Sequence, residues 1–381
     1  MAFLRNRAVN WINLHSGIQA LAQGMGGVFT LVFLLRAGVS IPASLCAMAL
    51  IFAARFAIRP AVLPAALRWG LRPLIIGGSL VVALQYLVLG GVTGADGSLV
   101  VFCLISALGY AFYWTCFHAY FALLGDSEHR GHQISAGVAL SAVVGIVAPL
   151  LGAWSLERVG PRAAFAIVAL VQATSVLPLL AIPQMRVPRE APTALRAALP
   201  GVGLFMADGW LDVSYYSVWQ IALFVSVGKS LSAYGGAMAL AALVGAVSGM
   251  LLGRHVDAGH GRRGVAIAFS ALALVLAARV ASVGTPWLAV ATNAASAIVG
   301  CLLVPVQMVP VYNLAKRSPC ALRFHIAAEG GWDIGHVAGS LAAAGAIALG
   351  ATLAEVIPFG FLAVVAQVLL LRRYYVRLAA W

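Results

Sequence analysis

The sequence predicts an all-α polytopic membrane protein with twelve transmembrane helices in two six-helix bundles. Composition, long apolar runs and a similarity between the two halves of the chain support this prediction. Of the 381 residues, 62% are hydrophobic and 9% are charged, whereas soluble domains are about 45–50% apolar and about 25% charged. A soluble enzyme is therefore excluded, because a water-soluble fold of this size could not bury so much apolar surface.

The apolar runs indicate helices rather than strands. A helix that crosses a bilayer needs about 20 apolar residues. Runs such as 264–283 are continuous, without the alternation that is typical of a transmembrane barrel. We therefore expect membrane spans at residues 12–35, 41–59, 73–92, 98–124, 134–156, 163–183, 201–227, 233–252, 264–283, 286–312, 325–349 and 352–371.

The basic residues predict an orientation. The net charge is +13, with 24 Lys and Arg against 11 Asp and Glu, and Lys and Arg gather in the cytoplasmic loops of membrane proteins. If both termini are cytoplasmic, most basic residues fall on that side, Arg55 and Arg59 among them. Arg279 lies near the opposite end of its span, where we expect it to extend to the interface. The chain is thus predicted to be a multi-pass protein of the inner (plasma) membrane with both termini in the cytoplasm.

The two halves of the chain resemble each other. Residues 47–50 and 237–240 both read Ala-Met-Ala-Leu, and half the length of the chain separates them. Parallel repeats of this kind relate the two halves of many transporters. The expected units are a first six-helix bundle (1–183), a cytoplasmic central loop (184–200) and a second six-helix bundle (201–381).

A short motif connects these features to a known family. The segment GRHVDAGHGRR, residues 253–263, resembles the cytoplasmic loop signature of the major facilitator superfamily, with one extra residue between the aspartate and the following glycine. The resemblance covers the whole chain and implies a secondary transporter. The corresponding loop of the first half has Gly70 and Arg72 but lacks the aspartate.

The loop motif implies a gate. Its aspartate can pair with helix N-termini or with the arginines that follow, and such contacts hold helix ends together in one state and release them in another. The alternative is a solvated loop whose arginines merely follow the charge rule. The residues of this gating loop are Gly253, Asp257, Gly261, Arg262 and Arg263.

Residues 148–153, in the fifth span, read Ala-Pro-Leu-Leu-Gly-Ala. They are similar to an element of drug–proton antiporters, which favours antiport or efflux. A proline kink with small residues for close packing explains them equally well.

Acidic residues inside two spans are the strongest functional signal. Asp208 and Asp212 are four residues apart in span seven, and Glu329 and Asp333 repeat this spacing in span eleven, so each pair lies on one helix face. A carboxylate near the centre of a span costs about 2.5–3.5 kcal/mol. The acids therefore need water, a partner or a proton, and the resemblance implies that spans seven and eleven are neighbours with one shared wet pocket. We predict a proton-coupling set of Asp208, Asp212, Asp333, Glu329 and His336; interhelical hydrogen bonding is the alternative.

Polar and aromatic residues at helical spacing predict a cavity for a solute with apolar and hydrogen-bonding parts, although packing or an interfacial belt is the alternative for each of them. Pro305 and Pro310 in span ten, with Gly330 and Gly331 in span eleven, are expected bending points. The predicted cavity residues are His15, Gln19, Gln23, Tyr110, Trp114, His118, Tyr215, Tyr216, Trp219, Asn293 and Gln307.

The sequence contains neither a phosphate loop nor a nucleophile or zinc motif, so we expect no enzyme, no cofactor and no resident metal. The expected partners are a small-molecule substrate, protons and the lipid bilayer; we expect no nucleic acid, and a monomer. The leading hypothesis is a secondary active transporter that moves a small organic solute by alternating access with proton coupling. One alternative is a divalent-metal transporter that uses Asp208, Asp212, Asp333 and His336. The other is a receptor or scaffold that transports nothing.

Overall fold

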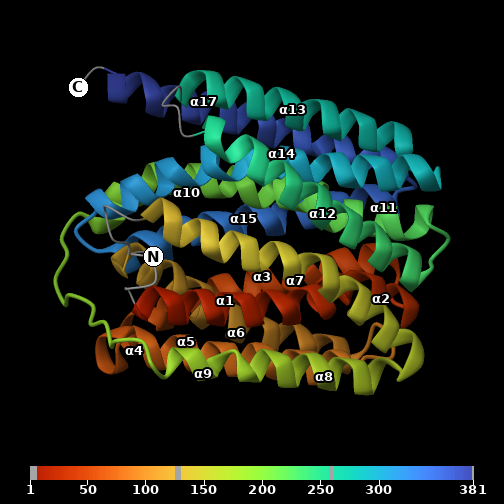
Figure 1. Cartoon of the computed structure of the whole chain (residues 1–381), viewed down its shortest axis with the longest axis horizontal. Coiled ribbons are helices and arrows are strands. Elements are labelled where there is room, and N and C mark those ends of the chain that lie inside the picture. Colours follow the sequence, from red (N-terminus) through yellow and green to blue (C-terminus); the bar gives the residue numbers. More distant parts are fainter. Residues whose placement is uncertain (1–6, 125–129, 257–260, 380–381) are drawn as a thin grey trace.

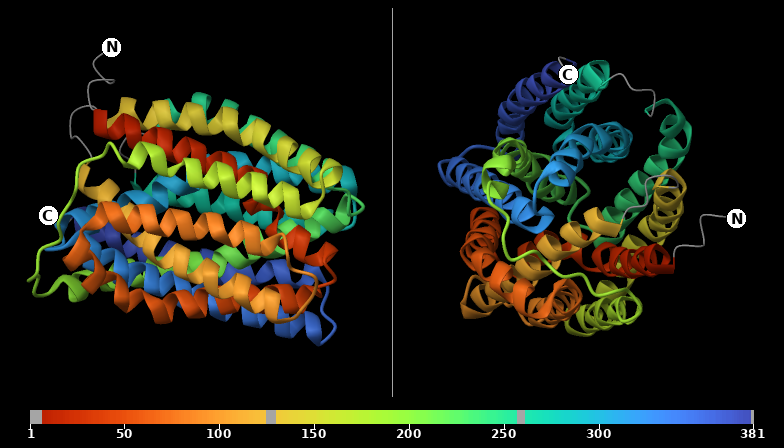
Figure 2. Two further views of the ribbon diagram at one scale, coloured as in Figure 1. Left: turned by 90° about the horizontal axis from the view of Figure 1, so that it is seen from below. Right: turned by 90° about the vertical axis from the view of Figure 1, so that its left-hand side faces the viewer.

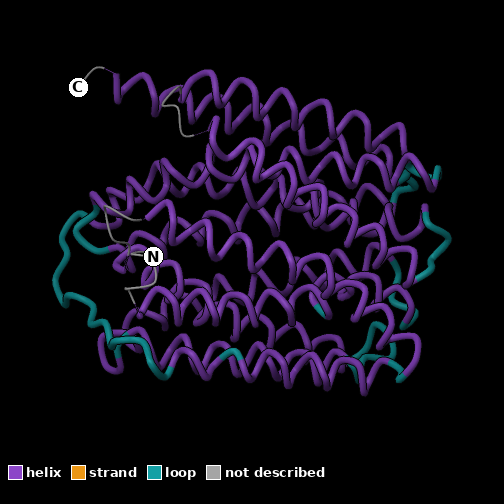
Figure 3. Tube along the Cα trace, in the orientation of Figure 1, coloured by secondary structure: helices purple, strands orange, loops and turns teal. Residues whose placement is uncertain are grey.

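The apolar runs form long helices that lie side by side along one direction (Figure 1). The structure is a computed structural model, and it describes residues 7–124, 130–256 and 261–379. These residues contain helices, turns and loops but no strand (Figure 3). The prediction of an all-helical chain is therefore confirmed for the described part.

The first half contains the following helices. They are α1 (Arg7–Met25), η2 (Gly27–Phe29), α2 (Thr30–Arg36), α3 (Ile41–Ile58), η3 (Arg59–Ala61), α4 (Val62–Trp69), α5 (Leu71–Leu89), α6 (Gly97–Leu124), α7 (Arg130–Arg158), α8 (Pro161–Thr174) and α9 (Val176–Leu179). Local capping explains some of their starts. The Ser40 hydroxyl accepts a hydrogen bond from Ala43 N at the beginning of α3, and Asp96 accepts one from Ser98 N (2.8 Å) at the beginning of α6.

The second half contains α10 (Ala194–Asp212), η4 (Val213–Val218), α11 (Trp219–Ser226), α12 (Leu231–Val256), α13 (Gly261–Ser282), α14 (Pro286–Arg317), α15 (Ala321–Ala348), α16 (Leu353–Val356), η5 (Ile357–Phe359) and α17 (Gly360–Ala379). Nine helical stretches within the described residues are long and apolar enough to cross a membrane. The chain is thus a multi-pass membrane protein. The helices that carry the acidic pairs, α10 and α15, are outside this set of nine.

The expected bending points lie within uninterrupted helices, so they do not break the spans, and bending at these residues stays a prediction. Pro305 and Pro310 lie inside α14, which is one continuous helix, and Gly330 and Gly331 lie inside the continuous α15. The irregular turn is instead η4, a π-helical segment that begins directly after Asp212. Such π-turns widen the helix and leave backbone groups available to other partners.

Glycines bring α10 and α15 into close contact. A Cβ atom on Gly209 would meet the carbonyl oxygen of Trp332, and one on Gly335 would meet that of Met206. Small residues allow helix backbones to approach each other in membranes. This contact confirms that the two helices with acidic pairs are neighbours.

Helices distant in the sequence also pack together near the acids. Both α3 and α6 pack against α15, and α7 packs against α12 (Figure 2). The first of these contacts places the arginines at the end of α3 beside the acids of α15.

The segment between α9 and α10 crosses one end of the molecule. The Gln184 side chain donates to Trp69 O (2.5 Å) and accepts from Arg72 N (3.1 Å), so it binds both sides of Gly70. Gly70 has a positive φ of 78°, a conformation that favours glycine. In the loop that lacks the aspartate of the family signature, a glutamine from the segment between α9 and α10 therefore binds the backbone on both sides of the glycine.

Candidate functional site

Two arginines and two acids form a buried cluster between α3–η3 and α15. Arg55 donates from Nε to Asp333 Oδ1 (2.5 Å) and pairs with the same oxygen through Nη2. Arg59 donates to Asp333 Oδ2 from Nε (3.0 Å) and from Nη2 (2.5 Å). Its Nη1 donates to Glu329 Oε2 (2.8 Å). We call Arg55, Arg59, Glu329 and Asp333 the buried charge cluster.

All four side chains are removed from water. Asp333 is completely buried, and even the most accessible member, Arg55, is only 6% exposed. Two positive and two negative charges make the cluster neutral. Transfer of each ion from water costs several kcal/mol, which the pairing offsets only while every partner is present. The cluster is therefore stable when α3 lies against α15, and separation of the helices would require water or a proton to replace the lost contacts.

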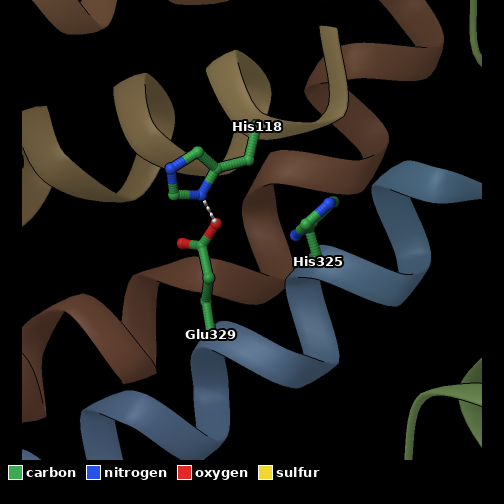
Figure 4. Close-up of side chains that lie close together, drawn as sticks. All are labelled: His118, His325 and Glu329. Carbon is green, nitrogen blue, oxygen red and sulfur yellow. Dashed lines mark hydrogen bonds and ion pairs between the residues drawn. The ribbon is translucent and has the colours of Figure 1, made fainter. Parts of the chain in front are cut away.

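Helix α6 adds polar groups to the Glu329 side of the cluster. Thr115 Oγ1 accepts from Arg59 Nη1 (2.7 Å), and His118 Nδ1 lies 2.9 Å from Glu329 Oε1. His325, one turn before Glu329 on α15, lies beside this pair (Figure 4). Its two ring nitrogens are buried and have no hydrogen-bond partner.

Aromatic rings cover the other side of the cluster. The Arg55 guanidinium lies 4.7 Å from the Phe52 ring centre and 4.9 Å from that of Trp332, which is cation–π geometry. The His336 ring packs on the same two side chains, 4.0 Å from Phe52 and 4.8 Å from Trp332. These rings separate the buried charge cluster from a second acidic group.

The second acidic group lies between α10, α14, α15 and α17. Asp208 Oδ1 accepts from Gln307 Nε2 (3.0 Å), and the same nitrogen lies 2.5 Å from Gln367 Oε1. Asp212 Oδ2 lies 3.2 Å from His336 Nε2, and its side chain is 28% exposed. The other ring nitrogen of His336 lies 3.1 Å from Ser340 Oγ. This group is partly exposed at Asp212, in contrast to the buried cluster around Asp333.

The predicted coupling residues thus fall into two sets. Glu329 and Asp333 share one face of α15, as expected, because Arg59 binds both. They do not share a wet pocket with the aspartates of α10, because their partners are arginines of the first half. Arg55 and Arg59, which were predicted only as basic residues of the cytoplasmic side, are both buried in the cluster.

Some of the predicted cavity residues of the first half make internal hydrogen bonds, and others remain partly exposed. His15 is completely buried between Ser175 O (2.7 Å) and Tyr113 OH (2.8 Å), and Gln19 also binds Tyr113. Tyr110 OH accepts from Gln85 (3.0 Å). Gln23, Trp114 and His118 keep partial exposure.

Most predicted cavity residues of η4, α11 and α14 pack inside the second half. Trp219 donates to Asn293 Oδ1 (3.0 Å), and both are buried. Tyr216 is exposed, whereas Tyr215 is buried. The expectation that Arg279 extends to the interface is wrong: its guanidinium donates to Tyr215 O in η4 (2.5 Å) and lies 4.1 Å from the Tyr215 ring centre. Gln307 binds Asp208, as described above.

The gating loop is only partly visible. Asp257 lies outside the described residues. Gly253 lies near the end of α12, and α13 begins with Gly261 and Arg262. Arg263 is exposed. The proposed contacts of Asp257 therefore remain a prediction.

The four residues predicted as a metal set do not converge in the described structure. Asp333 uses both oxygens for arginines, while His336 faces Asp212. Among the described residues, three other side chains have potential metal-ligand atoms within 4.8 Å of one another. They are His118, His325 and Glu329.

Sequence reasoning missed Arg55 and Arg59 as site residues. The sequence did carry a signal for them, namely their spacing. They are four residues apart at the end of an apolar run, as are Glu329 and Asp333. Matched spacings allow two helix faces to pair. Thr115, His325 and Gln367 carried no comparable pattern.

Comparisons with known proteins agree with this architecture. Residues 10–319 match the family model of the Major Facilitator Superfamily. No curated protein sequence matches the chain. Among solved structures, the nucleoside transporter NupG is similar, with 13% identity and a TM-score of 0.67 over 97% of this chain and 99% of that one. A D-xylose–proton symporter is similar with 13% identity and a TM-score of 0.66 over 97% and 96% of the two chains.

Proposed function

Because this chain belongs to the major facilitator superfamily, a family of membrane transporters and not enzymes, we propose that it moves a small organic solute by alternating access with proton coupling. The observation that carries this proposal is the buried charge cluster, which joins α3 to α15 across the two halves of the sequence. Such a bond is suited to a contact that forms in one state and breaks in the other.

In the proposed architecture, the helices form twelve spans in two six-helix bundles. Seen end-on, the helices before residue 181 and those after it occupy different parts of the molecule (Figure 2), which supports this division. The start of α1, the end of α17 and the 181–193 segment lie at one end (Figure 1). The excess of Lys and Arg supports a cytoplasmic location for that end, in a bacterial-type inner membrane.

Proton binding provides a route to open the cluster. A proton on Asp333 would neutralise the carboxylate and leave two guanidinium groups with Glu329 as their only counter-ion, which weakens the contact between α3 and α15. The partly exposed Asp212, which lies 3.2 Å from His336, offers an entry point for the proton. Coupling is therefore assigned to Asp208, Asp212 and Asp333, with Glu329 and His336 in support.

The solute is expected to have several hydrogen-bonding groups. The partly exposed polar and aromatic side chains of Gln23, Trp114 and His118 fit a compound with apolar and polar parts. Nucleosides and pentoses are the first compounds to test, since the similar structures are a nucleoside transporter and a D-xylose symporter. Symport and antiport give opposite dependence on the direction of the proton gradient.

Proteoliposomes with an imposed pH gradient test the proposal. We expect one solute of a nucleoside and sugar panel to accumulate or leave only while the gradient lasts. The triple variant Asp208→Asn, Asp212→Asn, Asp333→Asn should lose this dependence. Asp96→Asn is the matched control, because Asp96 is an exposed carboxylate in the connection before α6, and it should transport like the original chain.

The double variant Asp208→Asn, Asp212→Asn leaves the buried charge cluster intact and covers the case in which the triple variant fails to fold. Unchanged gradient dependence in a folded triple variant would contradict the coupling assignment. Solute binding without any transport would instead support a receptor.

A further inference from the structure

His118, His325 and Glu329 have the chemistry of a metal site. One ligand atom from each lies within 4.8 Å of the other two. Two imidazole nitrogens and one carboxylate oxygen are a common set for zinc and related transition metals, whereas Mg²⁺ and Ca²⁺ prefer oxygen ligands alone. The three residues come from α6 and α15, which pack against each other.

His325 supplies an independent reason to expect a ligand. It is completely buried, and neither ring nitrogen has a hydrogen-bond partner in the structure. A buried polar group without a partner costs about 1–3 kcal/mol. Figure 4 shows a ring nitrogen of His325 turned toward His118 and Glu329. A metal ion between the three side chains would satisfy that nitrogen.

The distances require only small side-chain movements. Two ligands at zinc bond lengths in a tetrahedral site are roughly 3.3 Å apart. His118 Nδ1 and Glu329 Oε1 are 2.9 Å apart, so they need to separate slightly, and His325 needs to move inward. The His118 side chain is 21% exposed, so it is the member of the set that an ion would reach first.

The surroundings set limits on the affinity. Arg59 donates to the other oxygen of Glu329 (2.8 Å), so it orients the carboxylate in the manner of an outer-shell partner. Its positive charge also repels a dication. We expect weaker binding than at a structural zinc site, which has four protein ligands.

We propose that His118, His325 and Glu329 bind a transition-metal dication such as Zn²⁺ and thereby tie α6 to α15. The test uses the full chain, freed of metal with a chelator, in lipid nanodiscs. Calorimetry with Zn²⁺ should give one site per chain, and Co²⁺ should give the visible absorption bands of a low-coordinate complex. Zn²⁺ should also raise the thermal unfolding midpoint, since a ligand of the folded state stabilises it.

His325→Gln is the decisive variant, because the substitution breaks no hydrogen bond present in the structure. It should weaken Zn²⁺ binding more than about tenfold and abolish the thermal shift. His15→Gln is the matched control, a buried histidine elsewhere in the chain, and it should bind Zn²⁺ with the original affinity. Equal Zn²⁺ affinity in His325→Gln and the original chain, or no binding by either, would overturn the proposal.

Transport gives a second readout that rests on the proposed function. Zn²⁺ should slow solute movement by the original chain and leave His325→Gln unaffected, because a bridged α6 and α15 cannot separate. If Zn²⁺ binds through His325 without slowing transport, the metal site stands and transport does not require α6 to separate from α15.

Discussion

Arg59 and Asp333 are 274 positions apart in the sequence, yet two nitrogens of the Arg59 guanidinium donate to one oxygen of the Asp333 carboxylate, at 3.0 and 2.5 Å. Arg55 binds the other oxygen in the same manner. Charge-assisted bonds of this kind are about twice as strong as neutral ones. Their energy depends on complete pairing, and this dependence makes the cluster testable.

Asp333→Asn should destabilise the protein strongly. The substitution leaves two buried guanidinium groups with only Glu329 as counter-ion, and loss of one partner from a buried ion pair costs about 3–5 kcal/mol. The effect can be measured as a lower thermal midpoint in one fixed detergent, together with solute uptake.

The double variant Arg55→Met, Asp333→Asn distinguishes charge balance from simple loss of contacts. It restores neutrality with Arg59 and Glu329, so we expect it to be more stable than Asp333→Asn alone. Additive destabilisation in this double-mutant cycle would show that pairing is not what holds α3 to α15.

Gly335→Ala should disturb the contact between α10 and α15. Its new methyl group would meet the carbonyl oxygen of Met206 and lie 3.0 Å from Trp210 N, and overpacking of this kind costs about 1–3 kcal/mol. Gly345→Ala, on the same helix with open space around it, should be neutral or stabilising by up to about 1 kcal/mol. Comparison of the two unfolding midpoints checks the prediction, and equal effects would contradict the close contact.

Arg279→Lys should be destabilising although it keeps the charge. Arg279 donates from Nη1 to Tyr215 O in η4 and from Nη2 to Ser296 Oγ (2.7 Å), and one ammonium group cannot reproduce this planar fork. Loss of a buried partner predicts a cost of about 1–3 kcal/mol. The exposed Arg162 is the control: Arg162→Lys should change stability by less than about 0.5 kcal/mol. Equal midpoints for the two variants would mean that the π-turn does not depend on Arg279.

The sequence was sufficient for properties that depend on one helix at a time. Hydropathy predicted the helical class, and the four-residue spacing predicted that Glu329 and Asp333 share a face. It was insufficient where the partner lies elsewhere in the chain. A spacing says which residues share a face but not which helix that face meets, so Arg55 and Arg59 were interpreted only as basic residues of the cytoplasmic side.

Local irregularity was equally hard to predict. Prolines and glycines predicted bends in α14 and α15, but both helices are uninterrupted there, and the irregular segment is the π-turn η4, which accepts a hydrogen bond from an arginine of α13. The Gln184 contacts around Gly70 have the same origin, since they join distant segments through single side chains. Such tertiary contacts leave no periodic pattern in the sequence.

A reversible cross-link between α7 and α12 should arrest transport if the two halves move against each other. A Cβ atom on Gly145 would lie 3.3 Å from Ala242 Cβ, close to the 3.5–4.5 Å of disulfides. The variant Gly145→Cys, Ala242→Cys, in a background without the five native cysteines, should lose uptake on oxidation and recover it on reduction. Proteolysis at Arg186 or Arg189 reports cross-linking, because the two fragments stay joined until reduced. Gly145→Cys alone should be insensitive to oxidant. Full uptake by fully cross-linked protein would exclude separation of α7 from α12 during transport, and alternating access would then require movement at α3 and α15 alone.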